Sequence, residues 1–337
     1  MPSRLAAPVS PAPQGVVSSV GGDTSRTEPR LRTTAVVFAY DEEATLRRSI
    51  PALLASSVEE ILVMYGGQDG SRAYLESIRD PRLHLEFEPA RAGKWRAFNR
   101  AIERVRGEVV FLVSGDISFS PTVFDHLLAR FEPDVGVVFP RVIPSNIRGL
   151  VSRMGNALWD VHDFQIVECA RKGLPVHGGE LQAVRRSLLE PIAGVINEDA
   201  YLCLRAVERG YRVLYDRECV VRNTVPENLS DLLSQRTRVN YGHRQLTEVG
   251  LDPSTLDRLI WSRPRVCLRV LTQAIVHRSA NAVRLPLLAG LELIALARGN
   301  RDFTRGVEYG RWALIRSGKG GPFPAPTRDP ASAASDK

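Results

Sequence analysis

Two adjacent carboxylates, Glu198 and Asp199, stand near the start of the segment NEDAYLCLRAVERGYRV, residues 197–213. Asn is a preferred residue just before a helix, and acidic side chains in a first helical turn meet the positive end of the helix dipole. Gly210 lies where a residue of left-handed conformation would end such a helix. Helix formation alone therefore explains the pair, but a carboxylate in this position can also act as a general base that takes a proton from a hydroxyl group.

A third acid, Asp116, ends the apolar segment EVVFLVSGD, residues 108–116. A lone Asp at such a place often caps the turn that follows, whereas its hard carboxylate oxygens also suit Mg²⁺ or Mn²⁺. Downstream, Gln235, Arg236 and Arg238 belong to the segment QRTR, which taken alone is the polar start of a helix. Guanidinium groups bind phosphate oxygens bidentately.

These residues need a scaffold that brings them together, and strand-like and helix-like segments alternate along the chain from Thr33. Runs of β-branched residues predict buried strands, and the amphipathic segments between them predict helices. We expect strands at residues 33–40, 59–65, 82–87 and 108–116 and helices at residues 41–56 and 93–107. Repeated units of this kind predict an α/β fold with a mostly parallel sheet, helices on both faces and ligands at the carboxyl ends of the strands.

The composition is that of a globular protein, with 337 residues and 44% hydrophobic side chains. This length allows one large α/β domain and an appendage. The dinucleotide fingerprint GxGxxG and the P-loop GxxxxGK[ST] are absent, which argues against a dehydrogenase or an ATPase. The four cysteines are widely spaced and include no CxxC pair, so we expect reduced thiols in a cytoplasmic protein. The sequence contains no run of about 18 apolar residues, so it predicts no membrane span.

Seven short segments occur in an order that resembles the family-2 glycosyltransferases. They are AYDEE (39–43), GGQDGS (66–71), GKWRAFNRAI (93–102), SGDISFSP (114–121), GGELQAVRRSLL (178–189), NEDAYLCLRAVERGYRV (197–213) and QRTRV (235–239). Each segment is weak evidence alone, but their order is specific, and the resemblance covers roughly residues 33–245. It implies the GT-A fold, which is Rossmann-like, a nucleotide-diphosphate sugar as donor, and usually inversion of the anomeric centre.

The resemblance also implies roles for single residues. Asp199 would be the general base, with Glu198 as its neighbour, and Asp116 would be the metal-binding end of a DxD-like motif for Mg²⁺ or Mn²⁺. The other contacts to the nucleotide sugar would come from Tyr40, Asp41, Glu42, Tyr65, Lys94, Glu198, Gln235, Arg236 and Arg238. Residues 40–42 would lie beside the base and ribose, and Lys94 would approach the nucleotide or its phosphates. The QRTR residues would hold the diphosphate and the acceptor.

The chain departs from the family pattern at three places. Met64 and Tyr65 stand where an acidic turn usually follows the second strand, so Tyr65 would stack on the base in place of an Asp contact. Ser114 occupies the first position of the DxD-like motif, which leaves Asp116 as its one carboxylate. Val239 replaces the usual Trp after the last arginine, which argues against a processive polysaccharide synthase.

A basic arm follows the matched segments. Between Arg258 and Lys319, eleven arginines and one lysine outnumber three carboxylates, and the formal charge is +9. Residues 266–285 predict one helix, which Pro286 would break or kink before a second apolar helix begins. The polar stripe of the first helix would consist of Arg269, Gln273, His277, Asn281 and Arg284.

The arm has two interpretations. Its helices either pack on the catalytic domain or lie in the plane of an anionic membrane surface, with arginines on lipid phosphates. In the second case the acceptor would be lipid-linked. No recognisable nucleic-acid-binding motif accompanies the charge, so nucleic acid is not expected as a partner.

The resemblance therefore predicts an inverting, metal-dependent glycosyltransferase of class EC 2.4. It would move a sugar to a hydroxyl or phosphate of an acceptor that is either lipid-linked or a small molecule. A retaining transferase of the same fold and a non-catalytic nucleotide-sugar-binding protein are the alternatives. His243 is either a solvent-facing helix residue or a metal ligand, as in some related retaining enzymes. We expect the protein in the cytoplasm, with peripheral contact to the membrane if the arm binds lipid.

The predicted domain organisation follows composition and the extent of the resemblance. Pro, Ser, Gly and Ala are frequent at both ends of the chain, which is typical of disorder. We expect a disordered leader (residues 1–30), a GT-A catalytic domain (31–250), a basic helical region (251–320) and a disordered tail (321–337).

Overall fold

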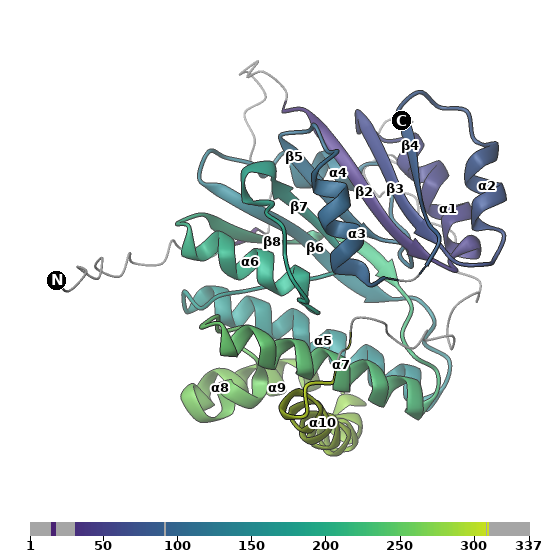
Figure 1. Ribbon diagram of the computed structural model, residues 1–337. Coiled ribbons are helices and arrows are strands. Elements are labelled where there is room, and N and C mark those ends of the chain that lie inside the picture. Colours follow the sequence, from purple (N-terminus) through teal and green to yellow (C-terminus); the bar gives the residue numbers. More distant parts are fainter. Residues whose placement is uncertain (1–14, 18–30, 91, 308, 310–337) are drawn as a thin grey trace, which may run out of the picture.

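The computed structural model describes residues 15–17, 31–90, 92–307 and 309, and in this part of the chain eight strands form one sheet (Figure 1). The strands are β1 (Gly15–Val17), β2 (Thr33–Tyr40), β3 (Glu60–Gly66), β4 (Leu83–Glu88), β5 (Val109–Ser114), β6 (Val135–Pro144), β7 (Leu181–Arg185) and β8 (Arg212–Asn223). Their order across the sheet is β1-β8-β6-β7-β5-β2-β3-β4. β7 is antiparallel to β5 and β6, and the other neighbouring pairs are parallel.

Helices cover both faces of this sheet (Figure 1). They are α1 (Glu43–Leu54), α2 (Ser71–Ser77), α3 (Lys94–Ile102), α4 (Val123–Leu128), α5 (Leu150–Arg171), α6 (Glu198–Glu208), α7 (Leu229–Glu248), α8 (Leu256–Ser262), α9 (Pro264–His277) and α10 (Asn281–Thr304). A short 3₁₀ helix, η1 (Arg186–Leu188), follows β7. The α/β fold of the GT-A type, with a mostly parallel sheet, is therefore confirmed.

The two faces of the sheet each bury their own core. Side chains of one strand alternate between these cores: Val36 contributes to one, and Ala35 and Val37 contribute to the other. The first core packs under α3, α5 and α6, and the second packs under α1, α2 and α4. Because both faces are covered, the strands are continuous apolar runs, the pattern from which the first four were predicted.

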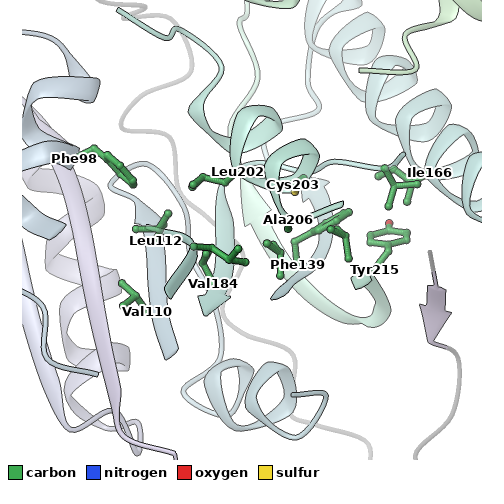
Figure 2. Close-up of a cluster of buried hydrophobic side chains, with 14 of the residues drawn as sticks. Phe98, Val110, Leu112, Phe139, Ile166, Val184, Leu202, Cys203, Ala206 and Tyr215 are labelled. Carbon is green, nitrogen blue, oxygen red and sulfur yellow. The ribbon is translucent and has the colours of Figure 1, made fainter. Parts of the chain in front are cut away.

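Figure 2 shows the first core, where Leu202, Cys203 and Ala206 of α6 lie over the strands. Phe139 of β6 and Tyr215 of β8 stack with ring centroids 5.3 Å apart. The Tyr215 hydroxyl donates a hydrogen bond to Oδ1 of the buried Asp163 at 2.8 Å. This core fixes α6 on the sheet, and α6 carries Glu198 and Asp199 at its first turn.

The arm forms a further helical layer on α5 and α7. α9 packs on α5, α10 packs on α7, and α8 packs on α9 (Figure 1). The predicted polar stripe faces α5, since Gln273 donates to Oε1 of Glu168 at 3.0 Å and Asn281 donates to Oδ2 of Asp160 at 3.0 Å. For Gln273 and Asn281 of this stripe, packing on the catalytic domain is the correct interpretation.

The predicted break at Pro286 is wrong. α9 ends at His277, α10 begins at Asn281, and Pro286 lies inside α10. The chain turns earlier because the buried Asn281 side chain donates to the Ala274 carbonyl at the end of α9, at 2.9 Å. The same carbonyl also accepts the amide hydrogen of Arg278 at 3.3 Å, so the Asn281 side chain adds a second bond at the end of this helix.

Other sequence expectations meet the structure only in part. Residues 15–17, within the predicted disordered leader, form β1 and pair with β8, whereas residues 1–14, 18–30 and the predicted tail lie outside the described residues. The four cysteines are buried and free, as expected. Within the ranges that the structure describes, no helix is long and apolar enough to cross a membrane.

Candidate active site

Asp116 lies two residues beyond the end of β5, at the carboxyl edge of the sheet. The turn that carries it requires Gly115, because a Cβ atom there would lie 2.7 Å from the carbonyl oxygen of Phe38 on the neighbouring strand. The Gly115 amide donates to the same oxygen at 2.8 Å. Close packing of this turn against β2 therefore determines where the Asp116 carboxyl group lies.

Lys94 and Glu198 form an ion pair at the same edge. Lys94 is the first residue of α3, and its Nζ lies 2.5 Å from Oε1 of Glu198, the first residue of α6. Their side chains are 27% and 8% exposed. Burial acts to lower the pKa of Lys94, but Glu198, followed by Asp199 and Glu180, raises it overall. The ammonium group therefore stays charged among these acids.

Asp199 is the second residue of α6, and Asn197 precedes the helix, as the sequence predicted. Gly179 faces the carboxylate so closely that a Cβ atom at this position would lie 2.4 Å from Oδ2 of Asp199. Asp199 interacts electrostatically with both Lys94 and Arg238: it contributes to the raised pKa of Lys94 and acts against the lowering of the Arg238 pKa by burial. The glycine thus allows the Asp199 carboxylate to lie against the backbone, with two cations in its surroundings.

Glu180 is a site residue that the sequence analysis did not single out. Its backbone φ is 65°, a conformation that is uncommon outside glycine and is often found at functional sites. Asn223 donates to Oε1 of Glu180 at 3.1 Å. Burial and the neighbouring Asp116 raise the pKa of Glu180 to about 7. Its place after two glycines in GGELQAVRRSLL, a segment that carries the family resemblance, was the available signal.

Arg238 of α7 is the second cation of the site. Burial lowers its pKa, while the surrounding carboxylates act in the opposite direction. Burial also raises the pKa of Asp116, against the effect of Lys94 and Arg238. We call the acid cluster the group formed by Asp116, Glu180, Glu198 and Asp199 with Lys94 and Arg238. Its four carboxylates outnumber its two cations, so it attracts a further positive charge.

The turn after β3 is held by Asp41, which directly follows β2. Oδ1 of Asp41 accepts the amide hydrogens of Gln68 at 2.7 Å and Asp69 at 3.3 Å. Gly67 has a φ of 108°, and a Cβ atom there would lie 2.1 Å from Oδ1 of Asp41. The Asp41 carboxylate therefore shapes this loop, and its contact with a nucleotide stays a prediction.

The neighbours of Asp41 lie at the same end of β2. A Cβ atom at Gly66 would lie 3.0 Å from the ring of Tyr40, so this ring packs against the end of β3. Glu42 precedes α1 and is 7% exposed. Both residues are at the carboxyl edge where the sequence predicted the nucleotide, and their direct contacts with it also stay predictions.

Tyr65 is the last but one residue of β3, but its ring is buried in the core, so the expectation that it stacks on a base is wrong. Its side chain is 2% exposed, and its ring lies 5.5 Å from that of Phe87. Successive residues of a strand point to opposite faces, and Tyr65 lies with Ile61 and Val63 in the core under α1 and α2. Its hydroxyl donates to Glu76 at 3.4 Å.

Arg236 and Gln235 lie on different faces of α7. Nε of Arg236 donates to Oε1 of Glu292 in α10 at 2.5 Å, and Asn240 donates to Oε2 of the same carboxylate at 3.3 Å. Residues two apart do not share a helix face, whereas residues three apart do, so Gln235 is the neighbour of Arg238. The structure brings Arg238 to the acid cluster and Arg236 to the arm. Phosphate binding by Gln235 and Arg236 stays a prediction.

Three histidines lie beside the acid cluster: His162 of α5, His177 before β7 and His243 of α7. Neighbouring rings are 5.8 Å and 5.5 Å apart between centroids. Nε2 of His177 donates to the carbonyl of Pro253 at 2.9 Å. Burial lowers the pKa of all three, to about 3 for His162. His243 is therefore a half-buried, neutral residue that packs on His177, so it does not simply face solvent as one interpretation expected.

The donor set fits a divalent cation that binds together with a substrate. Asp116 and Glu180 offer carboxylate oxygens, and Mg²⁺ is usually held by one or two carboxylates, water and substrate phosphates. In the described part of the chain, no group of three or more His, Cys, Asp or Glu side chains is arranged to hold a metal ion. A cation at this position would therefore need the diphosphate as a ligand.

Comparison with known sequences places this geometry in a family. The family model described as glycosyltransferase like family 2 matches residues 29–242, a range that includes the whole acid cluster. Two curated relatives are N-acetylglucosaminyltransferases of Rhizobium meliloti (strain 1021) and Mesorhizobium japonicum, each 24% identical. The matches cover 65% and 66% of this chain and 57% and 58% of the relatives, so the chain spans less than two thirds of their length.

Solved structures share the fold. A mannosyltransferase from Pyrobaculum calidifontis, in complex with GDP-Man and Mn²⁺, superposes with a TM-score of 0.59 at 19% identity, over 89% of this chain and 90% of that one. A glucosyl-3-phosphoglycerate synthase from Mycobacterium tuberculosis, in complex with phosphoglyceric acid, has a TM-score of 0.50 at 16% identity, over 71% of this chain and 89% of that one. At these identities the likeness concerns the fold.

Proposed function

The chain belongs to glycosyltransferase family 2, and on that premise we propose that it is an inverting, metal-dependent enzyme that transfers a sugar from a nucleotide-diphosphate sugar to an acceptor hydroxyl or phosphate. The observation that carries the proposal is the acid cluster. It combines a carboxylate at a helix start, Asp199, with the two cations Lys94 and Arg238 and the carboxylates Asp116 and Glu180. These are the groups for proton removal, leaving-group stabilisation and cation binding.

On the acceptor side, Asp199 takes the proton of the acceptor hydroxyl. The acceptor oxygen then bonds to the anomeric carbon, while the bond from that carbon to the β-phosphate oxygen breaks and the nucleoside diphosphate leaves. Gly179 supports the position of this carboxylate, since a side chain there would collide with Oδ2 of Asp199. Glu198 forms an ion pair with Lys94 and is adjacent to Asp199 in the chain. The ion pair therefore keeps the Lys94 ammonium group near the proposed base.

On the donor side, the cations meet the charge that develops on the diphosphate. Arg238 is the guanidinium that lies with the acid cluster, and its fork matches phosphate oxygens. Mg²⁺ or Mn²⁺, held by Asp116 and Glu180 when bound, supplies further positive charge to the diphosphate. Glu180 thereby provides the second carboxylate that Ser114 does not offer. The solved mannosyltransferase of the same fold has GDP-Man and Mn²⁺ bound, which supports this class of donor.

The acceptor of this proposal is lipid-linked, and the protein works as a peripheral protein at the cytoplasmic face of a membrane. The exposed apolar side chains of the arm support this location. Trp261, Leu268 and Leu293 are 87%, 66% and 68% exposed. The +9 charge of residues 258–319 suits anionic lipids.

The proposal is tested first by donor binding. UDP-, GDP- and TDP-sugars are screened by thermal shift with Mg²⁺, with Mn²⁺ and with EDTA. A ligand that binds only the folded protein raises its apparent stability, so one class of donor should raise the Tm in the presence of metal. No shift with any donor, in wild type and in Asp199→Asn alike, would contradict a nucleotide-sugar site.

The stereochemistry of the product separates inversion from retention. With the donor identified, NMR of the product shows the configuration of the new glycosidic bond. Inversion together with loss of transfer in Asp199→Asn supports a general base at this position. Retention would reassign the protein as a retaining transferase of the same fold, and binding without any turnover would make it a nucleotide-sugar-binding protein.

A further inference from the structure

A groove with three arginines lies where α10 meets α5. It has a volume of about 390 Å³ and is lined by Arg148, Leu150, Arg153, Ala280, Val283 and Arg284. These residues come from the start of α5 and the turn into α10, two segments far apart in sequence. We call this hollow the arginine groove. It is separate from the acid cluster and shares no residue with it.

The charge in the arginine groove is not balanced by the protein. Among the described residues, no carboxylate forms an ion pair with Arg148, Arg153 or Arg284, and the contact of Arg284 is a 3.5 Å hydrogen bond to Oδ1 of Asn281. Other arginines near the arm, such as Arg236 and Arg278, each pair with a carboxylate. Three guanidinium groups around one hollow repel one another, and an anion placed between them removes this repulsion.

An exposed apolar surface begins at the same groove. Along α10, Val283, Leu287, Leu293 and Ile294 are 71%, 50%, 68% and 51% exposed, and their spacing places them on one side of the helix. Leu150, beside the arginines of α5, is 61% exposed. We call these five residues the apolar face. Large exposed aliphatic side chains that share one helix side indicate an interaction surface.

We propose that the arginine groove binds the phosphate of an anionic phospholipid headgroup while the apolar face enters the same leaflet. The arginine groove and the apolar face lie next to each other, and this combination favours a phospholipid as the ligand. A free phosphate ion would use the arginines and leave the aliphatic side chains in water, whereas a phospholipid offers a phosphate and acyl chains next to each other. A helix that lies in the membrane plane combines an apolar side with arginines in this way.

The position of the groove connects it to the transfer reaction, and this step rests on the proposed function. Arg148 follows the last residue of β6 by four positions, and Asp116 follows the last residue of β5 by two. β5 and β6 are both antiparallel to β7, so they run in the same direction and end at the same edge of the sheet. Docking through the arginine groove therefore brings the edge that holds the acid cluster toward a lipid-linked acceptor.

Flotation with vesicles tests the headgroup site. Wild type should bind vesicles of phosphatidylcholine with phosphatidylglycerol and should bind pure phosphatidylcholine weakly. The double variant Arg148→Gln with Arg153→Gln should lose about 30-fold in affinity for the anionic vesicles, from two phosphate contacts. The matched control is Arg106→Gln with Arg186→Gln, two exposed arginines at the opposite edge of the sheet, which should bind like wild type.

A second pair of variants tests the apolar face. Leu287→Asn with Ile294→Asn keeps the charge and alters exposed side chains, so the fold should be unaffected, and vesicle binding should fall about 10-fold. The control is Leu229→Asn with Val249→Asn, two side chains on α7 and at its end that are 55% and 67% exposed.

The proposal is overturned if anionic vesicles do not bind wild type, or if the test and control variants lose affinity equally. It is also overturned if inorganic phosphate at low concentration displaces wild type fully from the vesicles, because the groove would then be a free-phosphate site. Donor-induced thermal shift with Mn²⁺ is measured on every variant. If it persists while vesicle binding is absent in wild type, the docking proposal fails and the transferase proposal stands. If vesicle binding follows expectation without any donor shift, the transferase proposal fails.

Discussion

Carboxylates meet donors and cations at the arm interface and in the acid cluster, and these two regions balance the negative charge differently. Where the arm packs on the catalytic domain, each buried acid meets donors from another helix. Oδ2 of Asp160 accepts from Arg278 and from Asn281, both at 3.0 Å, and Oε1 of Glu168 accepts from Gln273 at 3.0 Å. At the carboxyl edge of the sheet, by contrast, four carboxylates share two cations.

The difference separates a structural use of charge from a functional one. Pairing at the arm interface stabilises one arrangement of helices, because breaking it would leave a charge buried without a partner. The acid cluster instead holds Asp116 and Glu180 near each other with raised pKa values. An excess of carboxylates that the fold itself leaves unbalanced is suited to a cation and a substrate. The following predictions test this contrast, from the largest expected effect to the smallest.

Asp199→Asn should reduce the rate of transfer by roughly 10²- to 10⁴-fold, because the amide cannot take the acceptor proton. The Tm should change little, since the helix start is preserved. Glu198→Gln should cost less, through a weakened hold on Lys94. Steady-state kinetics of both variants, with Tm as the control for folding, check this. Equal activity of Asp199→Asn and wild type would return the pair to a role in helix formation.

Asp116→Asn should weaken metal-dependent donor binding by roughly 10-fold or more, because a carboxylate oxygen is lost from the cation site. Titration of the apo protein with Mn²⁺ and nucleoside diphosphate, followed by the EPR signal of free Mn²⁺, measures this without turnover. Glu180→Gln should weaken binding in the same assay. Unchanged Mn²⁺ affinity in both variants would exclude these residues from the cation site.

Asp160→Asn should lower the free energy of unfolding by about 1–3 kcal/mol and leave donor binding intact. The side chain is 6% exposed, and the change weakens hydrogen bonds to the ends of α9 and α10. Asp257→Asn, on the exposed side of α8, is the matched control and should cost a few tenths of a kcal/mol. Chemical denaturation measures both, and a loss of donor binding in Asp160→Asn would blur the contrast between the two regions.

Stability should depend on pH through Glu180. Burial and Asp116 raise its pKa from 4.5 to about 7, so between these values the folded protein keeps a proton that the unfolded chain has released. The free energy of unfolding therefore decreases as the pH rises from about 4.5 to 7. Glu180→Gln should flatten this part of the Tm profile relative to wild type. A parallel profile in the variant would mean that Glu180 does not titrate in this window.

Much of the fold could be predicted because its strands are local patterns. Residues 33–40 form β2 exactly as their apolar run predicted, and α6 begins at Glu198 after Asn197. The burial of Tyr65 could have been predicted from the sequence. Its alternation with Ile61 and Val63 already put it on the face of the second core. The position of Pro286 predicted the wrong helix boundary. The first helix of the arm ends earlier, where the Asn281 side chain donates to the carbonyl of Ala274, seven residues before it in the chain.

The site was only half visible in the sequence. Order along the chain singled out Asp116, Asp199 and Arg238, which the structure brings together. Glu180 was missed because its importance comes from a φ of 65° and from Asp116, which lies 64 positions away in the chain. Arg236 and Arg238 are indistinguishable by residue type, and the ion pair of Arg236 with Glu292 in α10 assigns them to different regions.

By itself, the sequence determined the alternation of strands and helices, the family, and the acids at the ends of β5 and the start of α6, because hydrophobic period and helix-end preferences are local. Only the tertiary structure decided which charges meet. Electrostatic environment depends on burial and on neighbours from other elements, and these are distances in space that no spacing along the chain records. Arginines of the same type therefore form ion pairs where the arm meets the catalytic domain, as Arg278 does with Asp160, and line an unbalanced groove between α5 and α10, as Arg153 and Arg284 do.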